Sequence, residues 1–215
     1  MRTVRNPARL SARAAGQPAK RTPSRRSFTL ALALLALGAP GLAGCKRSEP
    51  LPDLGEISQL DLLDQDGKPF SAASLRGRPH LAAFFFTRCP SICPRLTARM
   101  KEVRARTDAR ELTLVGISVD PENDTPEVLR AYAQKYGIDT HSWSLLTGPY
   151  RAIADVAENG FRIGLAGQAD ASKPDFGITH GSHLILLDAR GHIRGYYRSF
   201  DDDVVDRLVA DLPRL

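Results

Sequence analysis

"FFFTRCPSICPRLTARM", residues 84–100, joins a continuous apolar run to a pattern with helical spacing. The apolar run begins at residue 80, and such an unbroken run is typical of a strand covered on both faces. Two cysteines, Cys89 and Cys93, stand four apart at the junction, and a proline follows each of them. The stretch therefore predicts a buried strand that ends at a pair of thiols, with a helix beginning beside them.

Strand and helix patterns continue on both sides of this stretch. Before it, residues 57–75 predict a β-hairpin that turns at Asp66 and Gly67. A Gly-rich segment, residues 161–179, has no clear pattern and is typical of an insertion. The remaining elements that we expect are a strand at 111–120, a helix at 124–137, a strand at 143–147, a helix at 150–160, a hairpin at 182–200 and a helix at 201–212.

The order of these elements predicts the fold class. Alternating strands and helices indicate parallel strands joined by right-handed crossovers, and the closing hairpin adds antiparallel strands. We therefore expect one α/β domain over residues 57–215 with a thioredoxin-like layout. It has a central mixed β-sheet flanked by helices, an N-terminal hairpin, and the insertion before the penultimate strand. Cys89 then lies where the chain leaves a central strand.

The first 44 residues have the composition of an export signal. They hold eight lysines and arginines and no acidic residue, so the net charge of +6 belongs to them. The rest of the chain offers no electrostatic case for nucleic-acid binding. An apolar run follows "SRRSF", but it is short for a membrane span and Gly38 and Pro40 interrupt it.

The apolar run ends in "LAGC", which resembles the bacterial lipobox. We therefore expect Cys45 to be lipid-modified and to become the first mature residue. "SRRSFTL" also resembles a twin-arginine signal, and the alternative to a lipoprotein is a single N-terminal anchor helix. Both interpretations place the domain on the periplasmic side and attach it to a membrane. Residues 45–56, which are polar and Pro-rich, would form a tether.

Lipidation of Cys45 would leave Cys89 and Cys93 as the thiols of the domain, in an oxidising compartment. Three residues separate them, one more than in thioredoxin-type oxidoreductases. Residues four apart share one helix face, so Cys89 and Cys93 can present both sulfurs to one point. A helix N-terminus also favours the thiolate, which is the form that binds metal. Two soft thiolates favour copper(I) or zinc; a structural zinc site needs four ligands, whereas copper can be satisfied by two sulfurs and one imidazole. The alternative is a structural disulfide or two inert core thiols, but a disulfide across so short a loop would contribute little entropic stabilisation.

The chain has five histidines that could supply the imidazole. His80 begins the strand that leads to the cysteines, so it lies at the opposite end of the sheet, while His192 follows a turn and His141 lies in a polar connection. His180 and His183 flank the start of the penultimate strand, which reaches the thiols if it runs antiparallel to its neighbour. An offset of three places the two side chains on opposite sides of an extended chain, so one of them faces the thiols. The residue pattern alone does not choose between them.

Two acidic residues follow the strand at 111–120. Asp120 and Asp124 are candidates for groups that orient a metal ligand. Structural roles are favoured, because Asp124 or Thr125 can cap the next helix and Asp120 ends a strand before a proline.

"CPSICP", "SVDPENDTPEVLRAY" and "THGSHLILLDARG", taken in order, resemble the motifs of the Sco family, also called SenC. The first matches the CPxxCP motif, the second an Asp-Pro-rich segment, and the third the segment with the family's histidine ligand. That ligand lies eleven residues before a turn glycine, and counting back from Gly191 gives His180. The similarity runs from about residue 57 to the end. Gly181 stands where the family usually has Ser or Thr, and Arg88 where an aromatic residue or histidine is often found.

The resemblance implies a copper-binding thioredoxin-like protein, in a bacterial lipoprotein form, that serves cytochrome c oxidase assembly. It implies that Cys89, Cys93 and His180 bind one Cu(I) or Cu(II) ion. The metallochaperone would deliver copper to the copper-binding subunit of the oxidase, with other periplasmic copper chaperones as further candidate partners. The alternative function is a thiol-disulfide oxidoreductase that reduces cysteines of a partner protein, which requires the two cysteines but not His180.

Overall fold

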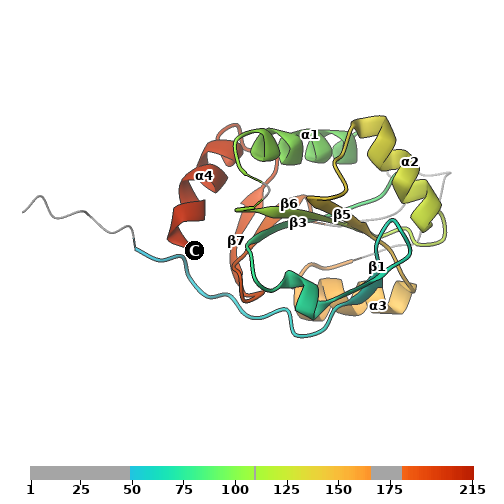
Figure 1. Cartoon of the computed structure of the whole chain (residues 1–215), viewed down its shortest axis with the longest axis horizontal. Coiled ribbons are helices and arrows are strands. Elements are labelled where there is room, and N and C mark those ends of the chain that lie inside the picture. Colours follow the sequence, from blue (N-terminus) through green and yellow to red (C-terminus); the bar gives the residue numbers. More distant parts are fainter. Residues whose placement is uncertain (1–48, 109, 166–180) are drawn as a thin grey trace, which may run out of the picture. The chain divides into compact units, whose positions relative to one another are not determined.

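The computed structural model describes residues 49–108, 110–165 and 181–215, which form an α/β domain (Figure 1). Within these ranges, none of the helices has the length and apolar character that a membrane crossing requires. The elements are β1 (Asp61–Leu63), β2 (Pro69–Ser71), η1 (Ala72–Leu75), β3 (His80–Phe85), α1 (Ile92–Ala105), β4 (Thr113–Ser118), α2 (Pro126–Tyr136), β5 (Trp143–Leu146), α3 (Tyr150–Asp155), η2 (Val156–Gly160), β6 (His183–Leu187), β7 (Ile193–Arg198), α4 (Val204–Asp211) and η3 (Leu212–Arg214).

The main sheet is mixed, as the sequence predicts, and its strand order is β5-β4-β3-β6-β7. β3 pairs in parallel with β4, and β4 with β5, whereas β6 runs antiparallel to both β3 and β7. The carboxyl ends of β3, β4, β5 and β7 therefore meet the amino end of β6 at one edge. We call this edge, which the chain leaves through Cys89, the cysteine edge. The predicted N-terminal hairpin is β1 and β2, which pair separately from this sheet.

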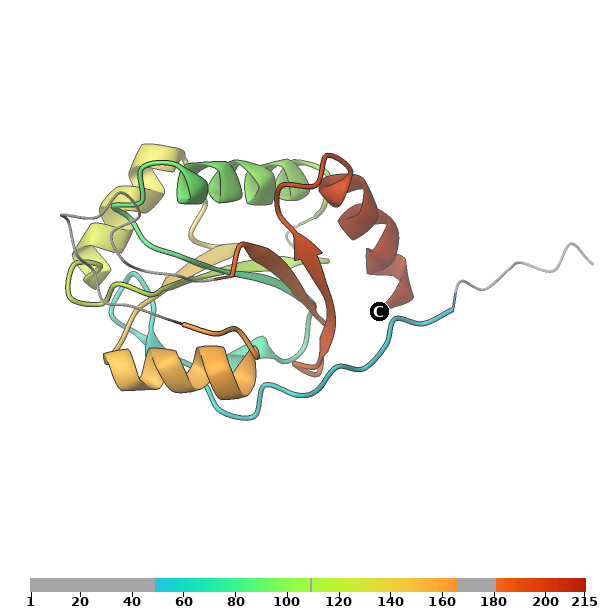
Figure 2. The same cartoon turned by 180° about the vertical axis from the view of Figure 1, so that it is seen from behind.

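Helices cover both faces of the sheet. α1, α2 and α4 lie on one face and α3 on the other, and the view from behind in Figure 2 shows the same layers. All six residues of β3 are buried. The Phe85 ring lies 5.2 Å from that of Tyr132 in α2, while Phe84 meets Phe161, which follows η2, at 5.4 Å. Successive residues of β3 thus fill two different cores, which explains its continuous apolar sequence.

α2 begins and ends at residues with strong capping preferences. The Thr125 side chain accepts a hydrogen bond from the Val128 N–H group, and Pro126 occupies the first turn. Gly137 ends the helix with a φ of 60°, in the left-handed region that glycine enters without strain. Of the two predicted caps, Thr125 is therefore the one used, and Asp124 makes other contacts.

Residues 51–57 run along the start of β7, although the sequence assigned residues up to 56 to a tether. The Leu54 N–H group donates to the Ile193 carbonyl at 2.9 Å, and the Ile193 N–H group donates to the Gly55 carbonyl at 2.8 Å. These bonds make the segment part of the domain. The tether prediction is therefore wrong for residues 51–56.

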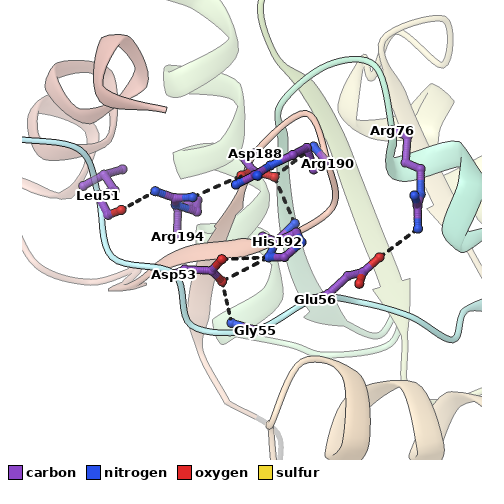
Figure 3. A network of polar contacts seen from close by, with 9 residues as sticks. All are labelled: Leu51, Asp53, Gly55, Glu56, Arg76, Asp188, Arg190, His192 and Arg194. Atoms are coloured by element: carbon purple, nitrogen blue, oxygen red, sulfur yellow. Dashed lines mark hydrogen bonds and ion pairs between the residues drawn. The ribbon is translucent and has the colours of Figure 1, made fainter.

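Charged side chains reinforce this attachment at the edge opposite the cysteine edge (Figure 3). His192 Nδ1 lies 2.9 Å from the Asp53 carboxylate, and Arg194 donates to the Leu51 carbonyl. Arg194 also pairs with the buried carboxylate of Asp188 at 3.2 Å. The segment is thus held by backbone and side-chain contacts to the β6–β7 hairpin.

His80 is a buried titratable group at the same opposite edge. Its side chain is 2% exposed, and its Nδ1 atom has no hydrogen-bond partner among the described residues. Burial lowers the pKa of His80 to about 4 from its ordinary value of 6.5. Between these two pH values an unfolded chain binds a proton that the folded chain does not, so acid favours unfolding.

We expect His80 to lower the free energy of unfolding by about 3 kcal/mol between pH 7 and pH 4. Replacing it, as in His80→Leu, should flatten the pH dependence by that amount in urea-unfolding measurements. His141→Ala is the control for loss of a histidine, because the His141 side chain is 96% exposed and lacks the burial to which the effect is attributed. A His80→Leu variant with the pH dependence of the parent would contradict burial as the cause.

Candidate metal centre

The two cysteines lie between β3 and α1, at the cysteine edge. α1 begins at Ile92, so Cys93 lies in its first turn and Cys89 lies before the helix. The expectation that a shared helix face presents both thiols is therefore wrong for Cys89, because Pro90 disfavours the helical conformation at the residue before it. Pro94 is tolerated, since the first N–H groups of a helix have no acceptor within it.

Backbone N–H groups orient both sulfur atoms. The Cys93 N–H group donates to Cys89 Sγ at 3.3 Å, and the Phe86 N–H group donates to Cys93 Sγ at 3.5 Å. Both side chains carry thiols, with no disulfide between them. The turn from Phe86 to Cys93, and not a shared helix face, therefore orients the two sulfurs.

The two thiols have different environments. Cys93 is fully buried, whereas Cys89 is only half-buried. Burial raises the pKa of the Cys93 thiol, although the N–H group of Phe86 opposes that shift. This is the reverse of the shift expected at a helix N-terminus, because removing a thiolate from water outweighs the favourable helix end here. A metal ion that binds Cys93 must displace its proton.

Asp124 is fully buried beside this turn and contacts the residue two before Cys89. Its carboxylate accepts hydrogen bonds from the N–H group of Thr87 at 3.0 Å, from the Thr87 hydroxyl and from the Ser118 hydroxyl. Burial raises the pKa of Asp124, and the hydrogen bonds from Ser118 and Thr87 act in the opposite direction. The favoured interpretation of Asp124 as a helix cap is therefore wrong.

Asp120 contacts the residue directly before Cys89. Its side chain is 2% exposed, and Arg88 Nε and Nη2 donate to its Oδ2 atom at 3.1 and 2.8 Å. Asn123 donates to the other oxygen at 2.8 Å. In the sequence, Arg88 stands out only as a departure from a motif. Its contact with Asp120 follows from the parallel pairing of β3 and β4, which was the one signal that could have revealed it.

One of the two candidate histidine ligands, His180, lies outside the described residues. The other, His183, places its ring edge-on to that of Tyr196, with centroids 6.5 Å apart. The Tyr196 hydroxyl donates to the Phe161 carbonyl at 3.0 Å, on the α3 side of the sheet. The His183 ring therefore lies on the α3 face of the sheet, whereas α1, which carries Cys93, covers the other face.

The described residues supply two sulfur ligands at the cysteine edge. His80 and His192 lie at the opposite edge, and His141 is exposed. Within the described ranges, no group of three or more His, Cys, Asp or Glu side chains is arranged to hold a metal ion. Cys45, the predicted lipidation site, lies outside these ranges, as His180 does. Two adjacent thiols fit a soft ion such as copper better than a hard cation.

Three solved structures resemble this chain over most of their length. A SCO1/SenC family lipoprotein from Bacillus anthracis is 29% identical, with a TM-score of 0.67, and covers 75% of this chain and 95% of its own. BsSco, described as a member of the Sco family of cytochrome c oxidase assembly proteins with a disulfide switch, is 28% identical, with a TM-score of 0.67 and coverages of 77% and 96%. Bradyrhizobium japonicum ScoI with copper bound is 29% identical, with a TM-score of 0.62 and coverages of 74% and 98%.

These neighbours have the thioredoxin-like α/β architecture that the sequence predicts. The family model described as SCO1/SenC matches residues 53–214, which include both cysteines and the whole main sheet. The resemblance found in the sequence motifs is thereby confirmed: this chain belongs to the SCO1/SenC family.

Proposed function

We propose that this protein is a copper metallochaperone that binds one copper ion and supports copper-site assembly in cytochrome c oxidase. The observation that carries the proposal is the pair of sulfurs, each oriented by a backbone N–H group, at 3.3 Å for Cys89 and 3.5 Å for Cys93. Thiolates are the ligands that Cu(I) prefers. The copper-bound ScoI relative and the assembly role in the description of BsSco support the same function.

His180 is the third ligand in this proposal. Two arguments support it: the eleven-residue spacing to Gly191, and the place of the His183 ring on the far face of the sheet. Copper bound to Cys89, Cys93 and His180 would pass to the copper-binding subunit of the oxidase. Other periplasmic copper chaperones are candidate donors.

We further propose that residues 1–44 are a lipoprotein export signal and that Cys45 carries the lipid. The lipobox-like "LAGC" and the description of the Bacillus anthracis relative as a lipoprotein support this. The domain would then work on the periplasmic side of a membrane, within reach of a membrane-bound oxidase.

A thiol-disulfide oxidoreductase is the second candidate, favoured by the unequal exposure of the thiols. The half-buried Cys89 would attack a partner's disulfide and release one partner thiol. Buried Cys93 would then attack the mixed disulfide, which forms a Cys89–Cys93 disulfide and releases the second partner thiol. A dithiol donor would return the pair to its reduced form. The disulfide switch described for BsSco supports this redox chemistry.

We expect the purified, reduced protein to bind one copper ion per chain, and the Cys89→Ala and Cys93→Ala variants to lose this binding. Oxidation to the Cys89–Cys93 disulfide should also block it, because the same sulfurs cannot pair covalently and act as two thiolate ligands. Elemental analysis after desalting measures the stoichiometry. Full loading of the oxidised protein without reductant would contradict the proposed site.

We expect His180→Ala to weaken Cu(II) binding more than Cu(I) binding, because Cu(II) is harder and gains more from an imidazole. The thiolate-to-copper absorption band should change as well. His183→Ala is the matched control and should alter neither. Spectral changes with His183→Ala but not with His180→Ala would show that the spacing argument has misplaced the ligand.

In a Cys45→Ser background, we expect Cys93→Ser to leave one reactive thiol and Cys89→Ser to leave a protected one. Reaction with Ellman's reagent should be at least about tenfold faster at Cys89, because Cys93 is buried and its thiolate is disfavoured. Equal rates in the two variants would rule out Cys89 as the attacking thiol.

We expect Cys45→Ala to accumulate as an unprocessed precursor, because a lipobox cysteine is both the acceptor of the lipid and the site of cleavage. Mass spectrometry of the membrane fraction distinguishes precursor from lipidated product. Normal processing elsewhere, with release of soluble protein, would overturn the lipoprotein assignment.

A further inference from the structure

Asp120 and Asp124 are two buried carboxylates. Neither helix capping nor an exposed ion pair explains why they are buried. They follow β4 at the cysteine edge, and burying a carboxylate is unfavourable unless hydrogen bonds or a cation compensate it. Thr125 already caps α2, so the helix does not require Asp124. Each carboxylate also contacts a residue of the turn from Phe86 to Cys93, here called the cysteine turn: Asp124 contacts Thr87, and Asp120 contacts Arg88.

Asp124 and Asp120 hold consecutive residues. Asp124 accepts two hydrogen bonds from Thr87, one from its N–H group and one from its hydroxyl. Asp120 accepts two from the Arg88 guanidinium, at 3.1 and 2.8 Å. Cys89 follows immediately, so the backbone that carries the first sulfur is attached to the end of β4 at both preceding positions.

The same segment also determines the place of the second sulfur. The Phe86 N–H group contacts Cys93 Sγ, and the Cys93 N–H group contacts Cys89 Sγ. The Cys89 N–H group donates to the Phe86 carbonyl at 3.3 Å, which closes the turn. A displacement of Thr87 would move Phe86 on one side and Cys89 on the other. Both sulfur contacts therefore depend on where Thr87 and Arg88 are held.

We propose that Asp120 and Asp124 are positioning residues that hold the cysteine turn in the geometry that binds copper. This inference rests on the proposed copper function. The carboxylates do not touch the metal. They keep the two sulfurs oriented before copper binds, so that binding costs less conformational entropy. They also favour the dithiol arrangement of the metal-free turn over the disulfide.

The test compares Asp124→Ala and Asp120→Ala with Asp188→Ala. Asp188 is a matched control, because it is also a buried carboxylate, 6% exposed, and it pairs with Arg194 and Arg190 at the opposite edge. Competition with a chromophoric chelator measures Cu(I) affinity in the full-length protein. We expect a loss of about tenfold or more for Asp124→Ala and Asp120→Ala, the range typical of groups that orient a metal ligand, and less than twofold for Asp188→Ala.

A second measurement needs no copper. Equilibration with reduced and oxidised glutathione gives the equilibrium constant of the Cys89–Cys93 pair, and we expect both site variants to shift it toward the disulfide by about fivefold or more. Failure of the parent to bind copper would refute the proposed function, while the glutathione equilibrium would still decide whether the carboxylates position the turn. An equal shift in Asp188→Ala, or none in the site variants, would overturn the positioning role.

Three further variants keep the test decisive if an alanine variant fails to fold. Asp124→Asn retains one oxygen for both the Thr87 N–H group and the Ser118 hydroxyl, which share a carboxylate oxygen, and its amide can donate to the Thr87 hydroxyl, so it should restore most of the copper affinity. Thr87→Val removes only the hydroxyl contact and should give an intermediate loss, whereas Thr87→Ser should match the parent. A copper affinity in Thr87→Val equal to that of the parent, together with no rescue by Asp124→Asn, would also overturn the proposal.

Discussion

The parallel pairing of β3 with β4 is the constraint on which the rest of the cysteine edge depends. Its register runs from His80 opposite Thr113 to Phe85 opposite Ser118, so both strands end at the same level. The chain beyond β3 then carries Thr87, Arg88 and Cys89, and the chain beyond β4 carries two carboxylates. Hydrogen bonds between these two extensions are possible only because the register aligns them. A change of one residue in that register would separate every donor from its acceptor.

The properties of the thiol pair follow from the turn rather than from the helix. Because Pro90 keeps Cys89 outside α1, one sulfur remains at the surface while the other lies under it. The buried sulfur has a raised pKa, and the surface sulfur is within reach of a partner. Such an arrangement suits an ion that must be held and then released, since the two ligands can be exchanged one after the other. It suits a transient mixed disulfide for the same reason.

The fold could be predicted from residue patterns because its central strands, β3 and β4, are continuous apolar runs and a helix such as α2 has clear ends. Thr125, Pro126 and Gly137 mark α2 in the sequence as they do in the structure. The environment of the cysteines could not be predicted in the same way. Burial of Cys93 and the contacts of Asp124 depend on which strands are neighbours, and local sequence does not carry that information. The attachment of residues 51–57 was missed for a similar reason, because a Pro-rich segment without periodicity does not indicate which strand it will pack beside.

That segment has a consequence for how molecules of this protein behave toward one another. β7 is the last strand of the sheet, and the outer edge of a terminal strand can pair with a strand from another molecule. Leu54 and Gly55 occupy the backbone groups of Ile193 that a foreign strand would otherwise use. A chain shortened to begin at residue 57, where the sequence patterns place the start of the domain, would keep every strand and the cysteine turn. It would also expose the start of β7 as a template for strand addition, and so make the domain prone to self-association.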